Sequence, residues 1–330
     1  MKKIEIIKPD DFHIHLRQGE ILKSSVRDCS PYFSRVLVMP NTIPPIASVR
    51  TLKSYEKEIR NLPGKMIPLM TFKLLKSLKT DEIKAMKNAG AVAGKFYPAG
   101  STTNSDDGIT NWREIKDLLS IMSELGLILS IHGEDPLVFS LEREKAFIPQ
   151  ILEIAREFPQ LKIVFEHLSS KEGVEAVEKG SDNLAGTITV QHLLMTLDDV
   201  IGGSLDPHSF CKPVLKGPED KKAIQRVVLD GNCKFFFGSD SAPHTIGNKE
   251  KGSAGCYTSP IALPLLVQFF DESNKLDLLE NFVSRYGADF YGLPYNKEKI
   301  TLVNKNWIVP DEYSGIKPIF SGKKINWDIG

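Results

Sequence analysis

The sequence is poor in the features that cross-link a chain or hold it in a membrane. No run of about 18 apolar residues occurs, so no transmembrane helix is predicted. Among 330 residues there are four cysteines, none spaced as C-x-x-C, at Cys29, Cys211, Cys233 and Cys256. This spacing gives no sign of a zinc knuckle or a redox pair, and it favours reduced thiols in the cytoplasm over a disulfide scaffold.

Net charge is also lacking, and no N-terminal signal peptide is expected. Lys plus Arg and Asp plus Glu each number 42, so the formal net charge is zero. A neutral chain has no long-range attraction for nucleic acid or for an anionic membrane. The opening residues MKKIE lack the apolar stretch of a signal peptide. We therefore expect a cytoplasmic protein whose partner is a small molecule, held by local charges if it is anionic.

What the sequence does contain is a repeated alternation of short apolar runs and longer amphipathic segments. Strands are expected at 11–16, 35–40, 65–72, 91–97, 126–132, 162–168, 184–190 and 234–240. Apolar residues at three- and four-residue spacing predict helices near 47–61, 79–89, 111–124, 146–158, 170–180, 218–231, 260–272 and 275–286. Nearly continuous apolar strands suit a parallel sheet covered on both faces. The eight alternations predict an α/β fold, a closed (β/α)₈ TIM-type barrel.

The length of the chain is compatible with one barrel domain or with two smaller domains. No internal repeat or low-complexity linker divides it, so we expect a single domain over residues 1–330. The tail after about residue 290 has short alternating runs and is expected to pack outside the barrel as a short C-terminal extension. Residues 98–110 and 241–259 are expected to form long loops that act as lids or binding loops.

Ionisable residues stand at the ends of the predicted strands. They close the first, fifth, sixth and eighth runs and lie within the fourth, at His15, His132, His167, Asp240 and Lys95. The C-terminal ends of barrel strands converge on one mouth, where activity resides. These side chains, far apart in sequence, are therefore expected to meet.

A second histidine, His13, precedes His15 by two positions in the first run. Side chains alternate across a strand, so the two imidazoles should share a face and can bind one metal ion. Two histidines that merely lie near the surface are the alternative. The other ionisable strand ends favour the metal site.

Lys95 is the unusual member of this set, because a protonated lysine cannot bind a metal ion. Its neighbours in the run AVAGKF are mostly apolar, and burial among them should lower its pKa and free the amine. A free amine can take up carbon dioxide to give a carbamate, whose two oxygens can bridge two metal ions. A buried lysine paired with a carboxylate is the alternative, and the residues alone leave it open.

Several motifs follow one another in a recognisable order. They are D-x-H-x-H-x-R from Asp11, MPNT from Met39, GKFYPAGSTTNS from Gly94, HGE from His132, FEH from Phe165 and GSDSAPH from Gly238. In this order, over about residues 7 to 295, they resemble the monofunctional bacterial form of the dihydroorotase family, in the amidohydrolase superfamily. The YPAGSTTNS and DSAPH stretches are the most specific to that family.

The resemblance implies a binuclear zinc centre. Its ligands would be His13, His15, Lys95, His132, His167 and Asp240. The first two histidines and the aspartate would bind the more buried zinc, and the other two histidines the second. Lys95, modified by carbon dioxide to N6-carboxylysine, would bridge the ions, and Asp240 would also be the catalytic proton shuttle. Manganese or cobalt can also occupy such a donor set.

The resemblance also implies a substrate site. Its residues would be Arg17, Asn41, Thr102, Thr103, Lys212, His244 and Ala254. The arginine, asparagine and histidine would hold the substrate carboxylate, the backbone near Lys212 and Ala254 would assist, and the threonines would lie on a closing loop. Two features depart from the family pattern: Lys212 replaces an apolar residue, and the segment 245–253 is short. Taken singly, Arg17 could be a structural ion pair and His244 a solvated side chain.

The implied activity is the reversible cyclisation of N-carbamoyl-L-aspartate to L-dihydroorotate, a step of de novo pyrimidine (UMP) biosynthesis, by a homodimer. Another cyclic amidase of the superfamily, such as a hydantoinase or allantoinase, is the first alternative. An inactive barrel that serves as a scaffold is the second, and the complete set of expected ligands disfavours it. His192 and His208 are expected to support the loop after the seventh strand without a catalytic role.

Overall fold

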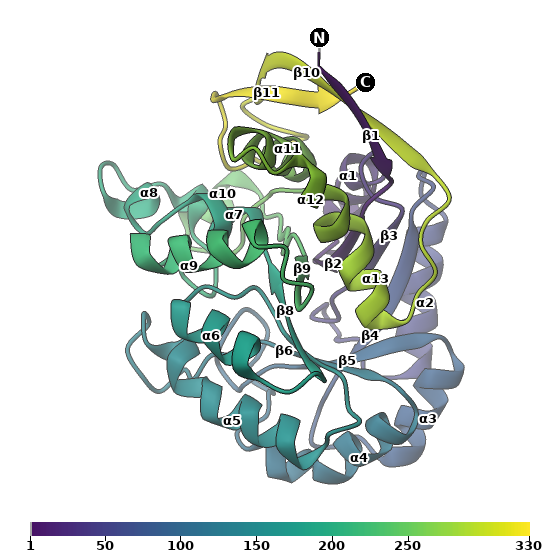
Figure 1. The fold of residues 1–330 in the computed structure, drawn as a ribbon. Coiled ribbons are helices and arrows are strands. Elements are labelled where there is room, and N and C mark those ends of the chain that lie inside the picture. The colour runs from purple at the N-terminus through teal and green to yellow at the C-terminus, as the bar shows by residue number, and fades with distance from the viewer. Residues whose placement is uncertain (1) are drawn as a thin grey trace.

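The computed structural model describes residues 2–330, and over these residues the chain forms an eight-stranded parallel barrel (Figure 1). The strands pair in chain order, so each connection between neighbours carries a crossover segment. They are β2 (Asp10–Ile14), β3 (Arg35–Val38), β4 (Ile67–Lys73), β5 (Ala91–Phe96), β6 (Ile128–Ile131), β7 (Ile163–Phe165), β8 (Leu184–Ile188) and β9 (Phe235–Phe237). Each overlaps a predicted strand, although several are shorter than predicted, and the (β/α)₈ barrel is confirmed.

Helices cover the outside of the barrel, and short helices also occur within the loops at its mouth. The longer ones are α1 (Gly19–Cys29), α2 (Val49–Arg60), α3 (Thr80–Asn88), α4 (Lys116–Glu124), α5 (Arg143–Glu157), α6 (Lys171–Lys179), α9 (Pro218–Leu229) and α11 (Ala262–Glu272). The shorter ones are α7 (Val190–Leu194), α8 (Asp198–Ile201), α10 (Ile246–Glu250), α12 (Leu276–Glu280) and α13 (Tyr286–Tyr291). A 3₁₀ turn (Trp112–Ile115) precedes α4, and a π-helical turn (Asn281–Arg285) joins α12 to α13.

Helix α2 illustrates why these segments are helical. The Ser48 hydroxyl accepts a hydrogen bond from the Thr51 backbone N–H at 3.2 Å, which satisfies one of the free donors at the helix start. Its buried residues, Leu52, Tyr55 and Ile59, recur at three- and four-residue spacing and form one apolar face. The helix therefore begins at a capping residue and packs that face against the barrel.

A small antiparallel sheet lies outside the barrel, near both chain termini (Figure 1). It consists of β1 (Lys3–Ile7), β10 (Lys299–Ile308) and β11 (Lys324–Ile329), with β10 in the middle. The Trp327 indole N–H donates to the Asp271 carboxylate of α11 at 3.0 Å, which anchors the sheet. The extension predicted after residue 290 is therefore present, but it includes an N-terminal strand that was not predicted.

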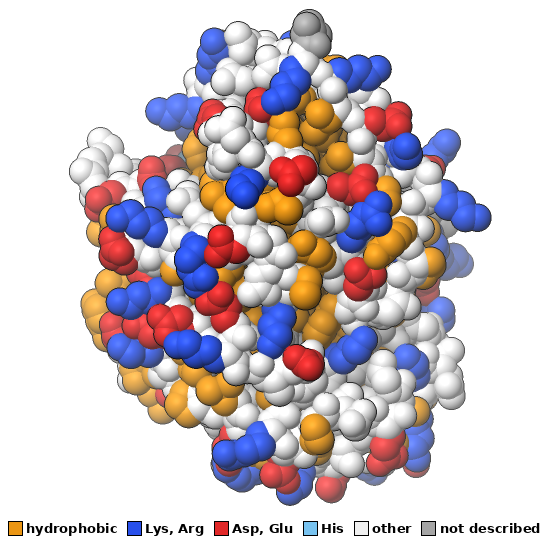
Figure 2. All heavy atoms as spheres, in the orientation of Figure 1, with side chains coloured by type: hydrophobic (Ala, Val, Ile, Leu, Met, Phe, Trp, Pro, Cys, Tyr) orange, Lys and Arg blue, Asp and Glu red, His pale blue; other side chains and the backbone are white. Residues whose placement is uncertain are grey.

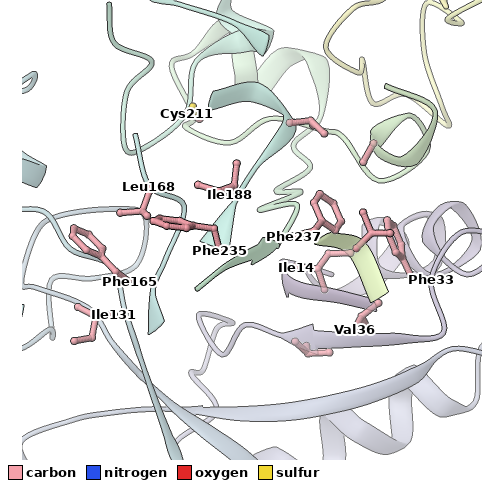
Figure 3. Close-up of a cluster of buried hydrophobic side chains, with 14 of the residues drawn as sticks. Ile14, Phe33, Val36, Ile131, Phe165, Leu168, Ile188, Cys211, Phe235 and Phe237 are labelled. Atoms are coloured by element: carbon pink, nitrogen blue, oxygen red, sulfur yellow. The ribbon is translucent and has the colours of Figure 1, made fainter. Parts of the chain in front are cut away.

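The core has an outer and an inner part. The outer part lies between strands and helices, where Phe33 stacks on Phe237 with ring centroids 5.7 Å apart, beside Ile14 and Val36 (Figure 3). The inner part, called the inner cluster below, fills the inside of the barrel at the end opposite its mouth, which we call the floor. Its buried members are Phe12, Ala93, Ile128, Val164, Ala185 and Phe236. Layers of side chains from several strands are the usual filling of such a barrel.

The outer surface carries charges of both signs. On the face drawn in Figure 2, basic and acidic side chains lie interspersed over the helices, as expected for a chain with zero net charge. None of the helices within residues 2–330 combines the length and the apolar character needed to cross a bilayer.

Candidate active site

The mouth of the barrel contains one polar pocket that gathers most of the residues singled out from the sequence. It is lined by His13, His15, Arg17, Asn41, Tyr97, Thr102, Thr103, His132, His167, Lys212, Asp240, Ala242, Ala254 and Gly255. Of the predicted site residues, only Lys95 and His244 are missing from this lining. Lys95 is fully buried in β5, and His244 lines an adjoining pocket together with Arg17 and Asn41.

The pocket forms where the barrel closes between β2 and β9. The Asp240 N–H donates to the His13 carbonyl at 2.8 Å, and the His15 N–H donates to the Ser241 carbonyl at 2.9 Å. The Asp11 carboxylate accepts from the Ser239 N–H at 2.8 Å, beside these bonds. The same hydrogen bonds that close the sheet thus bring the first and last strand ends together.

His13 faces inward partly because β2 contains a bulge. Asp11 pairs with Val36 and Ile14 with Val38, so the stretch between the two pairs has one residue more on β2 than on β3. Such an extra residue bends a strand and re-aims its side chains. Phe12 can therefore join the inner cluster while His13 also points toward the mouth.

His13, His15 and Asp240 form a group that can hold a metal ion, with one donor atom of each within 4.8 Å of the others. The Asp240 carboxylate lies 3.3 Å from Nε2 of His13 and 3.1 Å from Nε2 of His15. Burial alone would raise the pKa of Asp240, but hydrogen bonds from His13 and His15 and the charges of His13 and His167 hold it well below its usual range. The aspartate is therefore ionised, as a ligand or a base must be.

The other ring nitrogens of these histidines are held by side chains behind them. Nδ1 of His13 lies 2.8 Å from the Glu166 carboxylate, and Nδ1 of His15 lies 2.7 Å from the Asn41 side-chain oxygen. An acceptor at Nδ1 keeps a proton on that nitrogen, so Nε2, which faces Asp240, is the nitrogen that would bind a metal ion in place of a proton. With its oxygen turned toward His15, Asn41 has its NH₂ group available to donate to an anionic ligand.

His132 and His167 make a second pair of facing imidazoles. Nδ1 of His132 lies 3.0 Å from Nε2 of His167, and Nε2 of His132 lies 2.8 Å from the Glu134 carboxylate. Burial, and then the charge of His132, lower the pKa of His167 well below its ordinary value, so its imidazole is neutral. Two imidazole nitrogens that face each other at this distance are suited to share a metal ion.

Lys95 lies beneath the pocket without a partner. Its side chain is fully buried, and its amine nitrogen Nζ makes no hydrogen bond within residues 2–330. Nζ lies 5.4 Å from the centre of the Tyr97 ring. Burial lowers the pKa of this amine to about 8, against the opposing charges of Glu166 and Asp240. Lys95 is therefore not paired directly with a carboxylate among the described residues, contrary to the alternative considered from the sequence.

Three pocket residues adopt a left-handed backbone that is unusual for side chains other than glycine. The φ angles are 62° at Arg17, 44° at His167 and 45° at Asp240. Such conformations cost about 1–3 kcal/mol each and occur mainly where a site requires them. All three residues lie two or three positions beyond the end of their strands, at the rim of the barrel.

On the outer side of the pocket, Arg17 lies against His244. Nη2 of Arg17 is 2.9 Å from Nε2 of His244, and its Nε donates to the Pro243 carbonyl at 3.2 Å. The same His244 nitrogen lies 3.0 Å from the Ala254 carbonyl. Within residues 2–330 Arg17 is therefore not in a structural ion pair, and His244 is held by contacts with the protein, so neither alternative from the sequence applies. Arg17 is instead held by an imidazole and a backbone carbonyl, without a carboxylate from the described chain, which leaves the guanidinium charge available to an anion.

The loop that carries Thr102 and Thr103 reaches over the same pocket. The buried Lys73 amine at the end of β4 donates to the Asn104 carbonyl at 2.7 Å and contacts the Asp107 carboxylate. The predicted long loop 98–110 is therefore tied to the barrel next to its two threonines. The other predicted loop, 241–259, contains the short helix α10, which was not expected.

Several residues that shape the site were not singled out from the sequence. Glu166 accepts hydrogen bonds from His13 and Thr187, at 2.8 and 2.6 Å, and from Ser130. Glu134 contacts His132, and the hydroxyl of Tyr97 is buried without a partner within residues 2–330. Both glutamates lie within the FEH and HGE motifs, so their place beside a ligand histidine was the available signal.

The two remaining histidines differ in their surroundings. His192 is buried between the Thr189 hydroxyl at 2.8 Å and the Pro213 carbonyl at 3.0 Å, and neither ring nitrogen lines the pocket. His208 lies in a short 3₁₀ turn (Pro207–Ser209) outside the pocket lining. His192 thus ties the segment after β8 to residue 213, a structural contact.

Comparison with known families decides which group this architecture belongs to. The model of the Amidohydrolase family matches residues 6–323, nearly the whole chain. The chain belongs to the amidohydrolase family. The resemblance inferred from the motifs is confirmed at this level.

Within the amidohydrolases the similarity is to dihydroorotases over the full length. The dihydroorotase of Marinomonas sp. (strain MWYL1) is 42% identical, with all of both chains aligned. The crystal structure of dihydroorotase from Campylobacter jejuni has a TM-score of 0.93 and 34% identity, covering 99% of this chain and 97% of that chain. The Saccharomyces cerevisiae dihydroorotase structure, in complex with 5-fluoroorotic acid, has the same TM-score and identity, covering 100% and 99%.

The hydantoinase alternative is less well supported. L-Hydantoinase from Arthrobacter aurescens has a TM-score of 0.86 but only 17% identity, covering 99% of this chain and 83% of that chain, so it shares the fold alone. This amidohydrolase is accordingly a hydrolase of the dihydroorotase type that acts on cyclic amides, as the sequence predicted.

Proposed function

We propose that this amidohydrolase interconverts N-carbamoyl-L-aspartate and L-dihydroorotate with two zinc ions and a carbamate on Lys95, as a step of de novo pyrimidine synthesis. The observation that carries the proposal is one pocket that combines buried metal donors with a free guanidinium. His13, His15 and Asp240 supply the donors, and Arg17 lies at the rim. The relative in complex with 5-fluoroorotic acid, a carboxylated pyrimidine, supports the same substrate class.

The donor set fits two metal ions. His13, His15 and Asp240 would hold one ion, and the facing nitrogens of His132 and His167 would hold the other. Imidazole and carboxylate donors of this kind are typical of zinc. When bound, a metal pair supplies an activated water at neutral pH and polarises the amide carbonyl of the substrate.

The carbamate accounts for the buried, unpartnered amine of Lys95. The free, neutral amine would form a bond from its nitrogen to the carbon of carbon dioxide and release one proton, which gives an anionic carbamate. Its lowered pKa makes the free amine accessible near neutral pH. The resulting carboxylate oxygens would lie between the two groups of donors and satisfy the buried position.

The remaining residues would bind the substrate and move its proton. Arg17 would form a two-point contact with the substrate carboxylate, assisted by the NH₂ group of Asn41 and by His244. Asp240, which is ionised, would take the proton released by the attacking water and deliver it to the ring nitrogen as the amide bond breaks. The reverse sequence closes the ring.

Backbone and loop groups complete the proposed substrate site. The backbone near Lys212 and Ala254 would add contacts, since both residues line the pocket. The hydroxyls of Thr102 and Thr103 would cover the bound substrate and exclude water. The resemblance to bacterial dihydroorotases further supports a homodimer that works in the cytoplasm, which sedimentation analysis and localisation of a tagged chain would test.

Direct assay of three cyclic amides tests the proposed substrate. Purified zinc-loaded protein should hydrolyse dihydroorotate and leave hydantoin and allantoin essentially unchanged, because only dihydroorotate carries the carboxylate that Arg17 would bind. Metal analysis of the same sample should give two zinc ions per chain. Faster turnover of hydantoin or allantoin would replace the proposed substrate, and metal-free protein with full activity would refute the zinc centre.

The role of Arg17 is tested by replacement with methionine, which keeps most of the apolar stem of the side chain and removes the guanidinium and its charge. Loss of a charged hydrogen-bonded contact of about 1.5–3 kcal/mol should raise KM for dihydroorotate by roughly 10- to 100-fold. The zinc content should stay at the wild-type level. Arg60→Met, which removes an exposed arginine paired with Glu56 on α2, is the control and should leave KM unchanged. Loss of zinc from Arg17→Met would contradict the assigned role.

A further inference from the structure

Lys249, in the short helix α10, is a buried cation outside the catalytic set. Its side chain is only 3% exposed, and it forms no ion pair with a carboxylate within residues 2–330. Instead, Nζ donates to the carbonyl oxygens of Phe210 and Gly255, each at 2.7 Å. A buried ammonium is costly unless its donors are satisfied, so these carbonyls hold Lys249 in place as much as it holds them.

The two carbonyls belong to segments that reach the substrate pocket. Phe210 lies two residues before Lys212, and Gly255 follows Ala254; Lys212, Ala254 and Gly255 line the pocket. The Gly255 N–H also donates to the Phe210 carbonyl at 2.9 Å, so the segments are joined by a backbone bond and by the lysine. Lys249 therefore fixes the backbone on which two of the proposed substrate contacts depend.

Gly255 shows how closely this junction is packed. Its φ angle is 140°, and a Cβ atom at this position would lie 2.5 Å from the Ala242 carbonyl oxygen. A side chain could be accommodated only by moving the pocket wall, so the position of the segment is narrowly set. A small displacement after loss of the lysine would be transmitted directly to the Ala254 contact.

The charge of Lys249 also acts on the carboxylate end of the pocket. Burial, and after it the positive charges of Arg17 and Lys249, lower the pKa of His244 to about 3. The ammonium is thus within electrostatic reach of the two side chains proposed to hold the substrate carboxylate. A fixed cation behind that position favours an anionic ligand.

We propose that Lys249 is a positioning residue for the anionic substrate, which clamps the segments 210–212 and 254–255 and adds a fixed positive charge behind the carboxylate site. This inference rests on the proposed function, because it concerns the substrate of the same pocket. A purely structural role is the competing explanation, and the chain contains a suitable comparison for it.

Lys234 has the same chemistry in a different place. Its amine donates to the backbone carbonyls of Val177, Gly180 and Ser181, at 3.4, 2.7 and 3.3 Å, and none of these residues lines the pocket. Replacing either lysine by methionine removes an ammonium that joins backbone carbonyls and keeps most of the apolar stem. Only the replacement at position 249 should affect the substrate.

Steady-state kinetics of the zinc-loaded variants provide the first test. Lys249→Met should raise KM for dihydroorotate by roughly tenfold or more, change kcat by less than about threefold and retain wild-type zinc. Lys234→Met should lower the thermal midpoint and leave KM unchanged. Lys249→Gln keeps an N–H donor but not the charge, so its KM should lie between wild type and Lys249→Met; it replaces the methionine variant if that protein does not fold. An unchanged KM, or equal effects at the two lysines, would overturn the proposal.

Hydrogen exchange provides a test that needs no turnover. In the substrate-free protein, amides of residues 210–215 and 253–257 should exchange faster in Lys249→Met than in wild type, while Lys234→Met should leave them unchanged. Wild-type protein that binds zinc but does not convert dihydroorotate would refute the proposed function. The exchange result would still decide whether Lys249 holds these segments, and unaltered exchange there would refute the clamp.

Discussion

Two residues on one face of β5 separate the apolar floor of the barrel from its reactive mouth. Ala93 packs in the inner cluster, and Lys95, the next residue on that face, is a buried amine without a hydrogen-bond partner in the described chain. At β7 the same two-residue step leads from Val164 in the inner cluster to Glu166, just beyond the strand, which holds His13. Within one strand, a residue at the floor therefore packs in the core, and the residue two positions later, one layer nearer the mouth, takes part in the site.

The floor and the mouth also differ in how their residues contribute to the stability of the fold. At the floor, Phe12 stacks on Tyr291 with ring centroids 4.7 Å apart, and burial of apolar surface stabilises the fold without strain. At the mouth, charged groups are buried and His167 and Asp240 have left-handed backbone angles. The difference implies that changes at the mouth should affect activity more than stability, and changes at the floor should do the reverse.

The largest effect should follow replacement of Lys95 by methionine. Without the amine no carbamate can form, so we expect the second metal ion to be lost and kcat/KM for dihydroorotate to fall by about a thousandfold or more, which is at least about 4 kcal/mol. The midpoint of thermal unfolding, measured without metal, should not fall, because methionine removes a buried unpaired amine. Zinc analysis, kinetics and thermal denaturation of the same preparation test this.

The matched control for Lys95 is Lys73, which pairs with it in register on the adjacent strand β4. Lys73 is also buried, but it has partners, the Asn104 carbonyl and the Asp107 side chain. Lys73→Met should keep both metal ions and act only through the loop that carries Thr102. A Lys95→Met protein that retains two zinc ions and a tenth of the activity would contradict the proposed bridge.

A comparable effect of the opposite kind should follow replacement of Phe236 by alanine. Phe236 packs edge-on against Phe12 with centroids 5.4 Å apart, in the middle of the inner cluster. The cavity should lower the free energy of unfolding by about 3–5 kcal/mol, while kcat of the folded, metal-loaded protein changes little. Urea unfolding and kinetics measure the two effects. Phe139→Ala, at a ring that is 71% exposed, is the control and should cost less than about 0.5 kcal/mol.

A large loss of kcat in folded Phe236→Ala would show that the floor and the mouth are coupled. The prediction that the two regions act independently would then be wrong, while the predicted loss of stability from the cavity would be unaffected.

The sequence predicted the layout of this barrel because both of its signals are local. Apolar runs mark the strands, and the ionisable residues that end them need only the rule that parallel strand ends converge. Strand β1 was missed because its pairing is with β10, at the other end of the chain. Helix α10, with only five residues, is too short for a periodic pattern to identify.

The finer geometry of the site depends on neighbours that no local pattern specifies. The roles of Glu166 and Asn41 behind His13 and His15 follow from contacts across 153 and 26 residues of sequence. Helix α1 is a different case, since its buried residues Leu22 and Val26 have helical spacing and it could have been predicted.

The smallest expected effect concerns Tyr291, whose hydroxyl is buried at the floor without a hydrogen-bond partner in the described chain. Tyr291→Phe removes an unsatisfied polar group, so the free energy of unfolding in urea should stay the same or rise by up to about 1 kcal/mol. In Tyr286→Phe, the control, the lost hydroxyl donates to the Gly231 carbonyl at 2.9 Å, and the free energy should fall by about 1 kcal/mol. If Tyr291→Phe is instead the more destabilised of the two, its hydroxyl has a partner inside the barrel. Besides burial, the charge of Glu166 raises the pKa of Tyr291, so Glu166 is the acidic group nearest in effect to this hydroxyl. Polar contacts would then extend from the mouth to the floor.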